Sequence, residues 1–409
     1  MRNLLKTALA AKITSESSFL LPRLVARRIR NARRTRPTVE WFHRLDDAHS
    51  LLLGQALEQL SDAWEVDIIG RTISPTPKTL APQADLLRDY AATDARQIAP
   101  HLGLEVGYVT PDSDAVERGH SLLSSVEGTT DYLGLANDIG AILWTGSPIS
   151  EANSTETGAL ESNRRRLHRL GHYQSGMLFF EGEWFFGVDR LPLLVERLFE
   201  ERLGPRPNHF LALPPPPDKP AEIEFFYSVR SPYSYLALRR ALDIAEAANV
   251  PLTIRPVLPM VMRGEPVPFS KRVYLLRDAA REAHRHDIPF GRVRDPVGRG
   301  VERVIAVFVA AQAENLPAIR FLECAATAIW SQGVAVDRDR GLRKVCAEAE
   351  IPWEFASNAI RDESWRSAVE ANQVALREIG HWGVPTFRVG EHVLWGQDRL
   401  WLLEWLVSG

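Results

Sequence analysis

The chain has 409 residues and a net charge of −3 at pH 7, so its overall charge does not draw it to nucleic acid or to an anionic surface. Its length predicts two or three domains, and it has no apolar run of about 18 residues that could span a membrane. Its two cysteines, Cys324 and Cys346, are too few for a disulfide framework, so we expect a reducing, cytoplasmic location.

Residues 1–37 form a basic extension in which Glu16 is the one acidic residue. Lys6 and Lys12 interrupt the apolar core that a secretory signal peptide needs, which argues against export. The arginine-rich stretch from Arg27 to Arg36 predicts a solvated basic helix or arm. Such an arm could contact an acidic surface of its own protein, and the sequence leaves this question open.

Residues 38–210 predict a first α/β domain. The stretch from Val39 to Leu45 predicts a strand, and residues 48–60 predict a helix. A second strand is expected over residues 65–69. Helices follow, and the apolar run that begins at Met177 then predicts a hairpin.

A linker and a second domain follow. Four consecutive prolines within residues 211–220 predict a semi-rigid spacer, and the second domain occupies residues 221–409. It opens with an apolar, aromatic run from Ile223 to Val229 that predicts a buried strand. Ser231 and Pro232 then suit the N-cap and the first position of a helix.

The remaining elements of the second domain complete a recognisable order. Residues 250–257 predict a strand that is parallel to the first, and residues 271–380 are almost wholly helical in pattern. Residues 383–389 and 393–395 predict a hairpin, and an amphipathic helix closes the chain from Arg399 to Val407. This order predicts a thioredoxin fold with a helical domain inserted in its middle.

The two halves of the chain carry the same layout. Three blocks and one tyrosine align between them: residues 41–50 with 225–234, Tyr90 with Tyr274, residues 172–177 with 381–386, and residues 186–191 with 395–400. A repeat of this length indicates two copies of a whole domain. We therefore predict two tandem thioredoxin-like α/β domains, each with a helical insertion.

Three features of the second copy point to one site. Ser231 begins the first helix, Val384 and Pro385 begin a strand after a loop, and Gln397 and Asp398 begin the last helix. Each feature alone is typical of a cap or a strand boundary. In a thioredoxin fold, however, the first helix start, the residue before a cis-proline and the last helix start border one groove.

The second copy resembles a known family. The similarity depends on Phe-Phe-Tyr-Ser-Val-Arg-Ser-Pro-Tyr-Ser-Tyr-Leu-Ala at residues 225–237, Gly-Val-Pro-Thr-Phe at 383–387 and Trp-Gly-Gln-Asp-Arg-Leu at 395–400. These motifs resemble those of the 2-hydroxychromene-2-carboxylate isomerases and the kappa-class glutathione transferases, relatives of the DsbA-like thiol oxidoreductases. The resemblance covers residues 221–409.

The resemblance implies glutathione as the cofactor. By this likeness Ser231 contacts the glutathione sulfur, and the main chain of Val384, held by Pro385, pairs with the peptide part of glutathione. Gln397 and Asp398 would hold its γ-glutamyl end. The implied reaction is addition of the thiolate to a conjugated alkene of a small aromatic substrate, bond rotation and release. A kappa-like transferase would instead retain the conjugate.

The substrate side of the site is less well specified. Tyr233 is a candidate contact, and Arg263 suits bidentate binding of a substrate carboxylate, although a solvated loop arginine is an equal alternative. Ser228 stands where the isomerases usually carry an acid, Arg263 is the nearest cation where they often carry a lysine, and residues 295–299 differ from the usual pocket residues. These departures suggest a different substrate.

Two other functions compete with this interpretation. A DsbA-like dithiol oxidoreductase needs thiols at residues 231–234, where the chain has none. A non-catalytic protein that binds peptides along the Val384 edge remains the alternative. No cysteine and histidine spacing predicts a metal site.

The first copy lacks the features of that site. Asp47 stands in place of Ser231, Gly176 in place of Pro385 and Val188 in place of Gln397. We expect this copy to be structural, with a second pocket for another ligand as the alternative. Because single-domain relatives commonly dimerise, the tandem arrangement predicts a monomer with an intramolecular pseudo-dimer.

Overall fold

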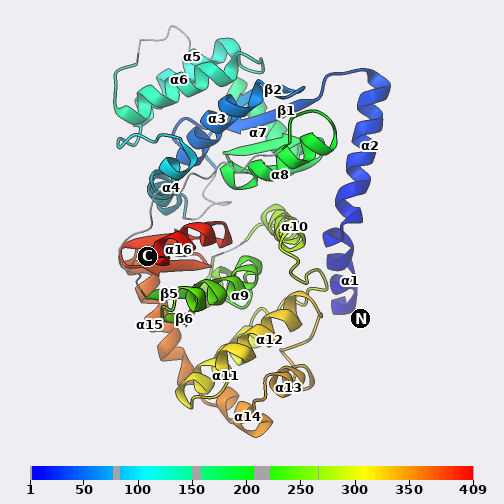
Figure 1. Ribbon diagram of the computed structural model, residues 1–409, viewed down its shortest axis with the longest axis vertical. Coiled ribbons are helices and arrows are strands. Elements are labelled where there is room, and N and C mark those ends of the chain that lie inside the picture. The colour runs from blue at the N-terminus through cyan, green and yellow to red at the C-terminus, as the bar shows by residue number, and fades with distance from the viewer. Residues whose placement is uncertain (1, 77–82, 150–157, 207–221, 266, 409) are drawn as a thin grey trace. The chain divides into compact units, whose positions relative to one another are not determined.

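The structure is a computed structural model (Figure 1), and it describes residues 2–76, 83–149, 158–206, 222–265 and 267–408. The chain falls into two compact units. We call residues 19–214 the N-terminal unit, and residues 1–18 together with 215–409 the C-terminal unit. The predicted linker at residues 211–220 lies outside the described residues.

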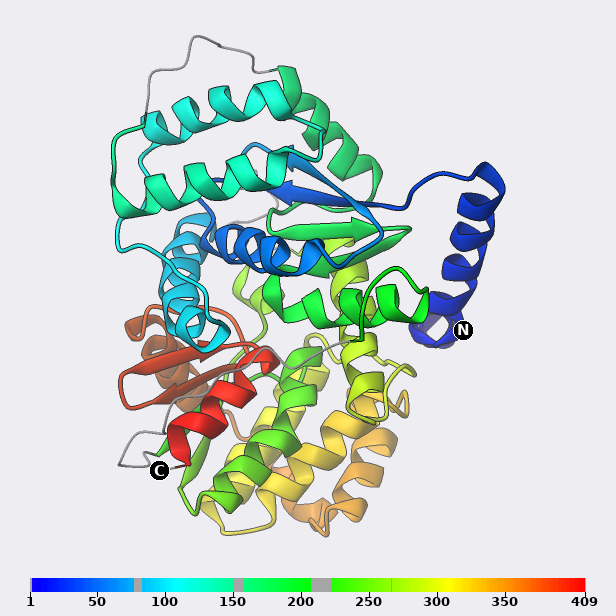
Figure 2. The ribbon, with the colours of Figure 1, turned by 45° about the horizontal axis from the view of Figure 1, so that its top comes forward.

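The N-terminal unit contains a four-stranded sheet. Its elements are α2 (Ser17–Arg33), β1 (Thr38–His43), α3 (Ala48–Ser61), β2 (Asp67–Thr72), α4 (Ala84–Ile98), η1 (Ala99–Leu102), α5 (Ser113–Leu123), η2 (Ser124–Val126), α6 (Tyr132–Thr145), α7 (Gly158–Arg169), β3 (Met177–Phe180), β4 (Glu183–Phe186) and α8 (Gly187–Glu200). The strand order is β2-β1-β3-β4, with β1 parallel to β2 and antiparallel to β3. Helices α3 and α8 pack side by side (Figure 2).

The C-terminal unit contains the second four-stranded sheet. Its elements are α1 (Arg2–Thr14), β5 (Ile223–Tyr227), α9 (Pro232–Ala247), β6 (Leu252–Pro256), η3 (Met260–Arg263), α10 (Phe269–Arg285), α11 (Arg299–Ala313), α12 (Ala318–Trp330), α13 (Asp339–Glu348), α14 (Trp353–Arg361), α15 (Trp365–Glu378), β7 (Thr386–Val389), β8 (His392–Trp395), η4 (Gln397–Arg399) and α16 (Leu400–Val407). The order β6-β5-β7-β8 and the strand directions match those of the other sheet. The predicted βαβ, helical insertion and ββα order of this half is confirmed.

The first strand of each sheet is central and buried. Every residue of β5 is buried, and in β1 only the first is exposed. Strands that are covered on both faces have this pattern of continuous burial instead of an alternation. The apolar run at residues 223–229 therefore predicted the burial of its strand as well as its presence.

The two units also share three kinds of side-chain contact. In each unit a tryptophan indole donates to the carbonyl two residues after the first strand (Trp144 to Leu45, 2.9 Å; Trp330 to Val229, 3.0 Å). An asparagine amide donates to the carbonyl of the last residue of the second strand (Asn163 to Thr72, 2.9 Å; Asn372 to Pro256, 3.0 Å). An arginine and a glutamate form an ion pair between the two parallel strands (Arg71 with Glu40; Arg255 with Glu224). Each contact satisfies a polar group that the sheet or its flanking loop leaves available.

The basic extension forms two helices that belong to different units. Helix α1 packs against α10, and Thr7 donates a hydrogen bond to the carbonyl of Val293 (3.0 Å). In α2, Arg23 and Arg30 form ion pairs with three glutamates of the N-terminal unit. The basic arm thus does contact an acidic surface of its own protein. Among the described residues, no helix combines the length and the apolar character needed to cross a membrane.

His43 makes the stability of the N-terminal unit depend on pH. The ring is buried at the end of β1, with Nδ1 3.0 Å from the hydroxyl of Tyr132. Burial, with smaller contributions from His120 and Arg44, lowers the pKa of His43 from 6.5 to about 3. Between these values the unfolded chain binds the proton more readily, so stability is lost as the pH falls from 6.5 towards 3.

We therefore expect His43→Gln to flatten the pH dependence of unfolding in this window. The lost slope is up to about 1.4 kcal/mol per pH unit for one proton. Urea unfolding at several pH values between 6.5 and 4 measures it. His168→Gln, at an exposed histidine of α7, is the control and should leave the slope unchanged. An equal slope in wild type and His43→Gln would show that other groups set the acid dependence.

Candidate active site in the C-terminal unit

Ser231 caps the first helix of the unit, as the sequence predicts. Its backbone is extended (φ −88°, ψ 121°), and its Oγ accepts a hydrogen bond from the amide of Ser234 (3.1 Å). The same hydroxyl donates to the carbonyl of Val384 (3.3 Å). Ser231 is half-buried. Because it caps α9 and bonds Val384, its hydroxyl lies at the positive end of the α9 dipole and directly beside the Val384 main chain.

The loop before β7 contains the expected cis-proline, because the Val384–Pro385 bond is cis. His381 helps to fix this loop: its Nδ1 accepts from the amide of Gly383 (3.0 Å). Thr386 Oγ1 donates to the carbonyl of Gly383 (2.8 Å). The role of His381 was not predicted from the sequence, although the aligned His172 in the first half of the chain was a signal for it.

The start of the last helix is tied to the same corner. The amide of Gly396 donates to the carbonyl of Pro385 (2.9 Å), and η4 begins at the next residue. Asp398 is half-buried, whereas Gln397 is 2% exposed. Ser231, Val384, Pro385 and this turn are therefore joined by direct hydrogen bonds, and the structure brings the predicted site residues together.

Gln397 is engaged by protein groups on both sides. Its Oε1 accepts from Arg240 (2.7 Å), and its Nε2 donates to Glu282 (2.8 Å) and to Asp398. Burial lowers the pKa of Arg240, and the charges of Glu282 and Asp398 oppose this shift. Arg240 and Glu282 were not predicted from the sequence, because they come from α9 and α10 and belong to no local motif.

The two candidate substrate residues make contacts inside the protein. Tyr233 donates its hydroxyl hydrogen to Asp278 of α10 (2.7 Å). The side chain of Arg263 is 9% exposed, and it donates to the carbonyl of Trp382 (2.7 Å). Burial lowers the pKa of Arg263, against the opposing charge of Glu265. The alternative of a solvated loop arginine is therefore wrong, and Arg263 instead contacts the loop that leads to Val384.

The corresponding corner of the N-terminal unit has different chemistry. Asp47 caps α3, and its carboxylate accepts from the amide of His49 (3.1 Å) and from the hydroxyl of Ser175 (2.6 Å). Gly176 has a positive φ of 67°, a conformation that glycine adopts readily. An ionised carboxylate is only an acceptor, so this corner offers no hydroxyl donor at the position of Ser231.

The fold and this helix-end site define a class of domain. A family model described as "DSBA-like thioredoxin domain" matches residues 222–407. The C-terminal half of the chain thus carries a DsbA-like thioredoxin domain.

Comparison with curated proteins narrows the relationship within that class. The chain is similar to 2-hydroxychromene-2-carboxylate isomerase of Pseudomonas putida, with 28% identity over 202 residues that make up 44% of this chain and 92% of the relative. The isomerase of Sphingobium xenophagum is 26% identical over 196 residues, 44% of this chain and 95% of the relative. These isomerases indicate that the C-terminal half is an enzyme of the DsbA-like group.

Two solved structures are also similar. One is a 2-hydroxychromene-2-carboxylate isomerase (26% identity, TM-score 0.38), which matches over 45% of this chain and 92% of that chain. Another is the cytosolic disulfide reductase DsbM from Pseudomonas aeruginosa (17% identity, TM-score 0.35), over 42% of this chain and 87% of that chain.

Proposed function

We propose that the C-terminal unit is a glutathione-dependent isomerase that acts on a conjugated aromatic 2-oxo acid, by cis–trans isomerisation or ring opening. The observation that carries the proposal is the 3.3 Å contact between Ser231 Oγ and the carbonyl of Val384. It places a hydroxyl donor, a helix N-terminus and a peptide-binding main chain at one point. A bound glutathione needs all three at once, for its sulfur and for its backbone.

Ser231 and α9 can activate the thiol. A free thiol has a pKa of about 8.5 and is mostly protonated at neutral pH. A hydrogen bond to the charged form is worth about 1.5–3 kcal/mol, and the dipole of the helix adds about 0.3–1 kcal/mol. At about 1.36 kcal/mol per unit, these contributions together lower the thiol pKa by about one to three units.

The rest of the corner suits the peptide part of glutathione. The main chain beside Val384, held by Pro385, can pair with the tripeptide as an added strand. Asp398 can accept from the α-ammonium group of the γ-glutamyl end. Because Gln397 already bonds Arg240 and Glu282, we propose that it acts by holding the turn of Asp398 in place.

The cis–trans isomerisation needs no co-reactant beyond bound glutathione, whereas ring opening also breaks the ring carbon–oxygen bond, with the hemiketal hydroxyl proton passing to the phenolate oxygen. Addition of the thiolate to the alkene forms a carbon–sulfur bond and turns the double bond into a single bond, with the charge held as an enolate. Rotation follows, and elimination re-forms the double bond and returns the thiolate. Tyr233, in the first turn of α9, remains our candidate for contact with the aromatic substrate. Arg263 remains a candidate for its carboxylate, although its present contact favours support of the Val384 loop.

We further infer that the N-terminal unit is a second, degenerate copy of the same thioredoxin-like fold. The equal strand orders and the three shared side-chain contacts support the duplication. Asp47 and Gly176 replace the groups that would activate and bind a thiol, so we propose a structural role for this copy. We also propose that the protein is a cytoplasmic monomer.

Calorimetric titration of the full-length protein with glutathione tests the proposal. We expect binding at millimolar glutathione or tighter, and weaker binding in Asp398→Asn because the α-ammonium loses its charged acceptor. Asp47→Asn, at the corresponding corner of the first copy, is the control and should bind as wild type does. Activity toward 2-hydroxychromene-2-carboxylate should require added glutathione.

The outcomes separate the competing functions. Binding together with a retained conjugate of an electrophilic substrate would indicate a kappa-like transferase. Absence of binding at millimolar glutathione would reject the cofactor and favour the non-catalytic protein that binds peptides along the Val384 edge.

A further inference from the structure

Helix α2 exposes an apolar face. Five of its large apolar side chains are about half exposed or more: Leu20 (50%), Leu21 (62%), Leu24 (51%), Val25 (55%) and Ile29 (48%). Successive residues of a helix turn by about 100°, so these five share one half of its surface. Phe19 and Arg30 lie on the opposite half and are buried. An exposed apolar stripe of this length on one helix suggests a contact surface.

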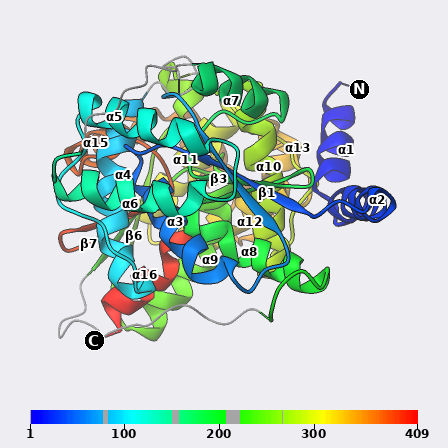
Figure 3. The same ribbon diagram turned by 90° about the horizontal axis from the view of Figure 1, so that it is seen from above.

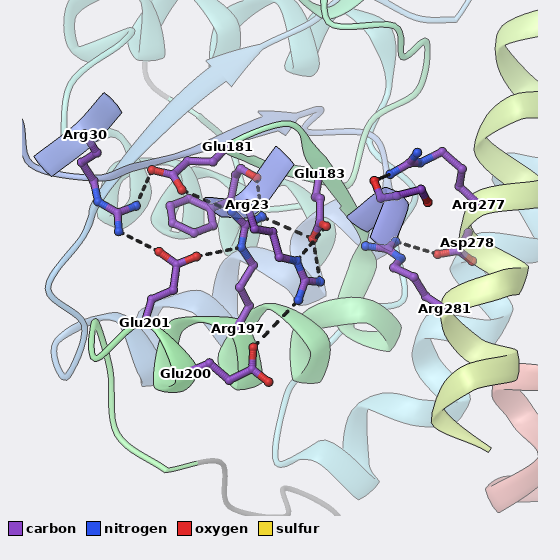
Figure 4. Close-up of polar contacts among 12 residues, drawn as sticks. Arg23, Arg30, Glu181, Glu183, Arg197, Glu200, Glu201, Arg277, Asp278 and Arg281 are labelled. Atoms are coloured by element: carbon purple, nitrogen blue, oxygen red, sulfur yellow. Dashed lines mark hydrogen bonds and ion pairs between the residues drawn. The ribbon is translucent and has the colours of Figure 1, made fainter. Parts of the chain in front are cut away.

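The polar face of α2 is fixed to its own protein (Figure 4). Arg23 donates to both carboxylate oxygens of Glu183 (2.9 and 3.0 Å). Arg30 bonds Glu181, and it also bonds Glu201 (2.7 Å). The usual orientation of a surface helix is thereby inverted, because Arg23 and Arg30 face the protein while its leucines face outward.

The surroundings of α2 agree with this orientation. Figure 3, in which α2 is seen end-on, shows the other helices of the N-terminal unit on one side of it only. If apolar packing alone oriented α2, its apolar residues would lie on the side that faces the N-terminal unit. The ion pairs of Arg23 and Arg30 place them on the other side instead.

Unpaired arginines surround the apolar face. Arg28 lies within it, Arg27 and Arg33 follow its two borders, and Arg34 comes directly after the helix. All four are exposed, and none forms an ion pair with any residue that the structure describes. From Ser17 to Val39 the sequence contains no acidic residue. The charge is therefore concentrated and of one sign, although the whole chain has a net charge of −3.

We propose that α2 attaches the protein peripherally to an anionic lipid bilayer. The apolar face enters the boundary between headgroups and acyl chains, and the arginines bind lipid phosphates. Arginine suits this role because its long apolar stem lies along the apolar layer while its guanidinium reaches a phosphate bidentately. The electrostatic attraction between a protein charge and an anionic bilayer decays within about 10 Å at ordinary ionic strength. The local charge of α2 therefore affects binding more than the net charge of the whole chain does.

A second copy of the chain fits this surface less well. A stable protein interface takes about 20–30 residues a side, whereas the exposed face of α2 has five large apolar residues. A symmetric pairing of two α2 helices would also bring arginines against arginines, which is unfavourable. Both arguments favour lipid as the occupant.

The test is co-sedimentation of the full-length protein with vesicles at low salt. We expect binding to vesicles of equimolar phosphatidylcholine and phosphatidylglycerol, and little binding to phosphatidylcholine alone. Leu21→Glu with Val25→Glu should reduce sedimentation to the phosphatidylcholine level. Arg27→Gln with Arg28→Gln should weaken binding to the anionic vesicles by roughly thirtyfold, from about 1 kcal/mol per arginine. Circular dichroism checks that each variant is folded.

Leu86→Glu is the matched control, because Leu86 of α4 is also an exposed leucine of the N-terminal unit (41%) and should not affect binding. The proposal is overturned if wild type does not sediment with anionic vesicles, if it binds both vesicle types equally, or if Leu21→Glu with Val25→Glu binds as well as wild type. A dimer in light scattering that this double variant dissociates would identify a second copy as the occupant instead. Glutathione binding is not involved, so this result is independent of the proposed activity.

Discussion

Ser231→Ala should lower glutathione-dependent turnover by about 10- to 150-fold. The estimate follows from the loss of one hydrogen bond to a thiolate, about 1.5–3 kcal/mol at about 1.36 kcal/mol per tenfold. The dipole of α9 remains in the variant, so some activation of the thiol should persist. Steady-state kinetics with saturating glutathione measure the effect, and the thiolate absorbance of bound glutathione should fall in parallel.

Ser234→Ala is the matched control for this experiment. Ser234 is a fully buried serine of the same helical turn, and its hydroxyl has no hydrogen-bond partner within the described chain. Its removal should leave both turnover and thiolate absorbance close to wild type. If Ser231→Ala retained the wild-type absorbance and rate, the hydroxyl would not be the group that stabilises the thiolate.

Arg197→Met should destabilise the N-terminal unit by about 3–5 kcal/mol. Arg197 is 1% exposed, and it forms ion pairs with Glu181 (3.2 Å), Glu183 (3.3 Å) and Glu201 (3.2 Å). It also donates to the carbonyl of Phe180 (2.9 Å). Removing one partner of a buried ion network leaves carboxylates in a site with little water, which accounts for the size of the effect.

Scanning calorimetry of the full-length chain measures this change. For a unit of about 200 residues we expect one transition to fall by roughly 6–20 °C, at about 2–4 °C per kcal/mol. Arg165→Met is the control, because Arg165 is 67% exposed and its one ion pair among the described residues, with Glu161, is long (3.9 Å). A surface pair of this kind contributes about 0–1 kcal/mol. A similar small shift for Arg197→Met would show that Arg23 and Arg30 compensate for its loss.

The sequence predicted those parts of the fold that short-range chemistry determines. The strand at Ile223, the cap at Ser231 and the hairpin turn at residues 390–391 all lie where the local pattern places them. Continuous apolar runs, capping and turn preference involve residues that are close in the chain, so their signals are visible without coordinates. The cis bond before Pro385 was expected from the order of elements, and it is present.

Those local patterns did not predict contacts between residues that are far apart in the chain. Gln397 bonds Arg240 and Glu282 from two other helices, and Arg263 faces the carbonyl of Trp382 instead of solvent. A side chain that can be either solvated or buried has the same local pattern in both cases. Which of the two occurs depends on the group that the tertiary fold brings opposite to it.

The sequence by itself determined the order of elements, the caps, the cis-proline corner and the basic character of the N-terminal extension. Only the tertiary structure decided which charges are neutralised and which faces stay exposed. Arg23 and Arg30 of α2 meet glutamates that are about 150 residues or more away in the chain, and this leaves Leu21 and Val25 facing outward. The physical reason is that ion pairing depends on distance in space, whereas composition and periodicity record only distance along the chain.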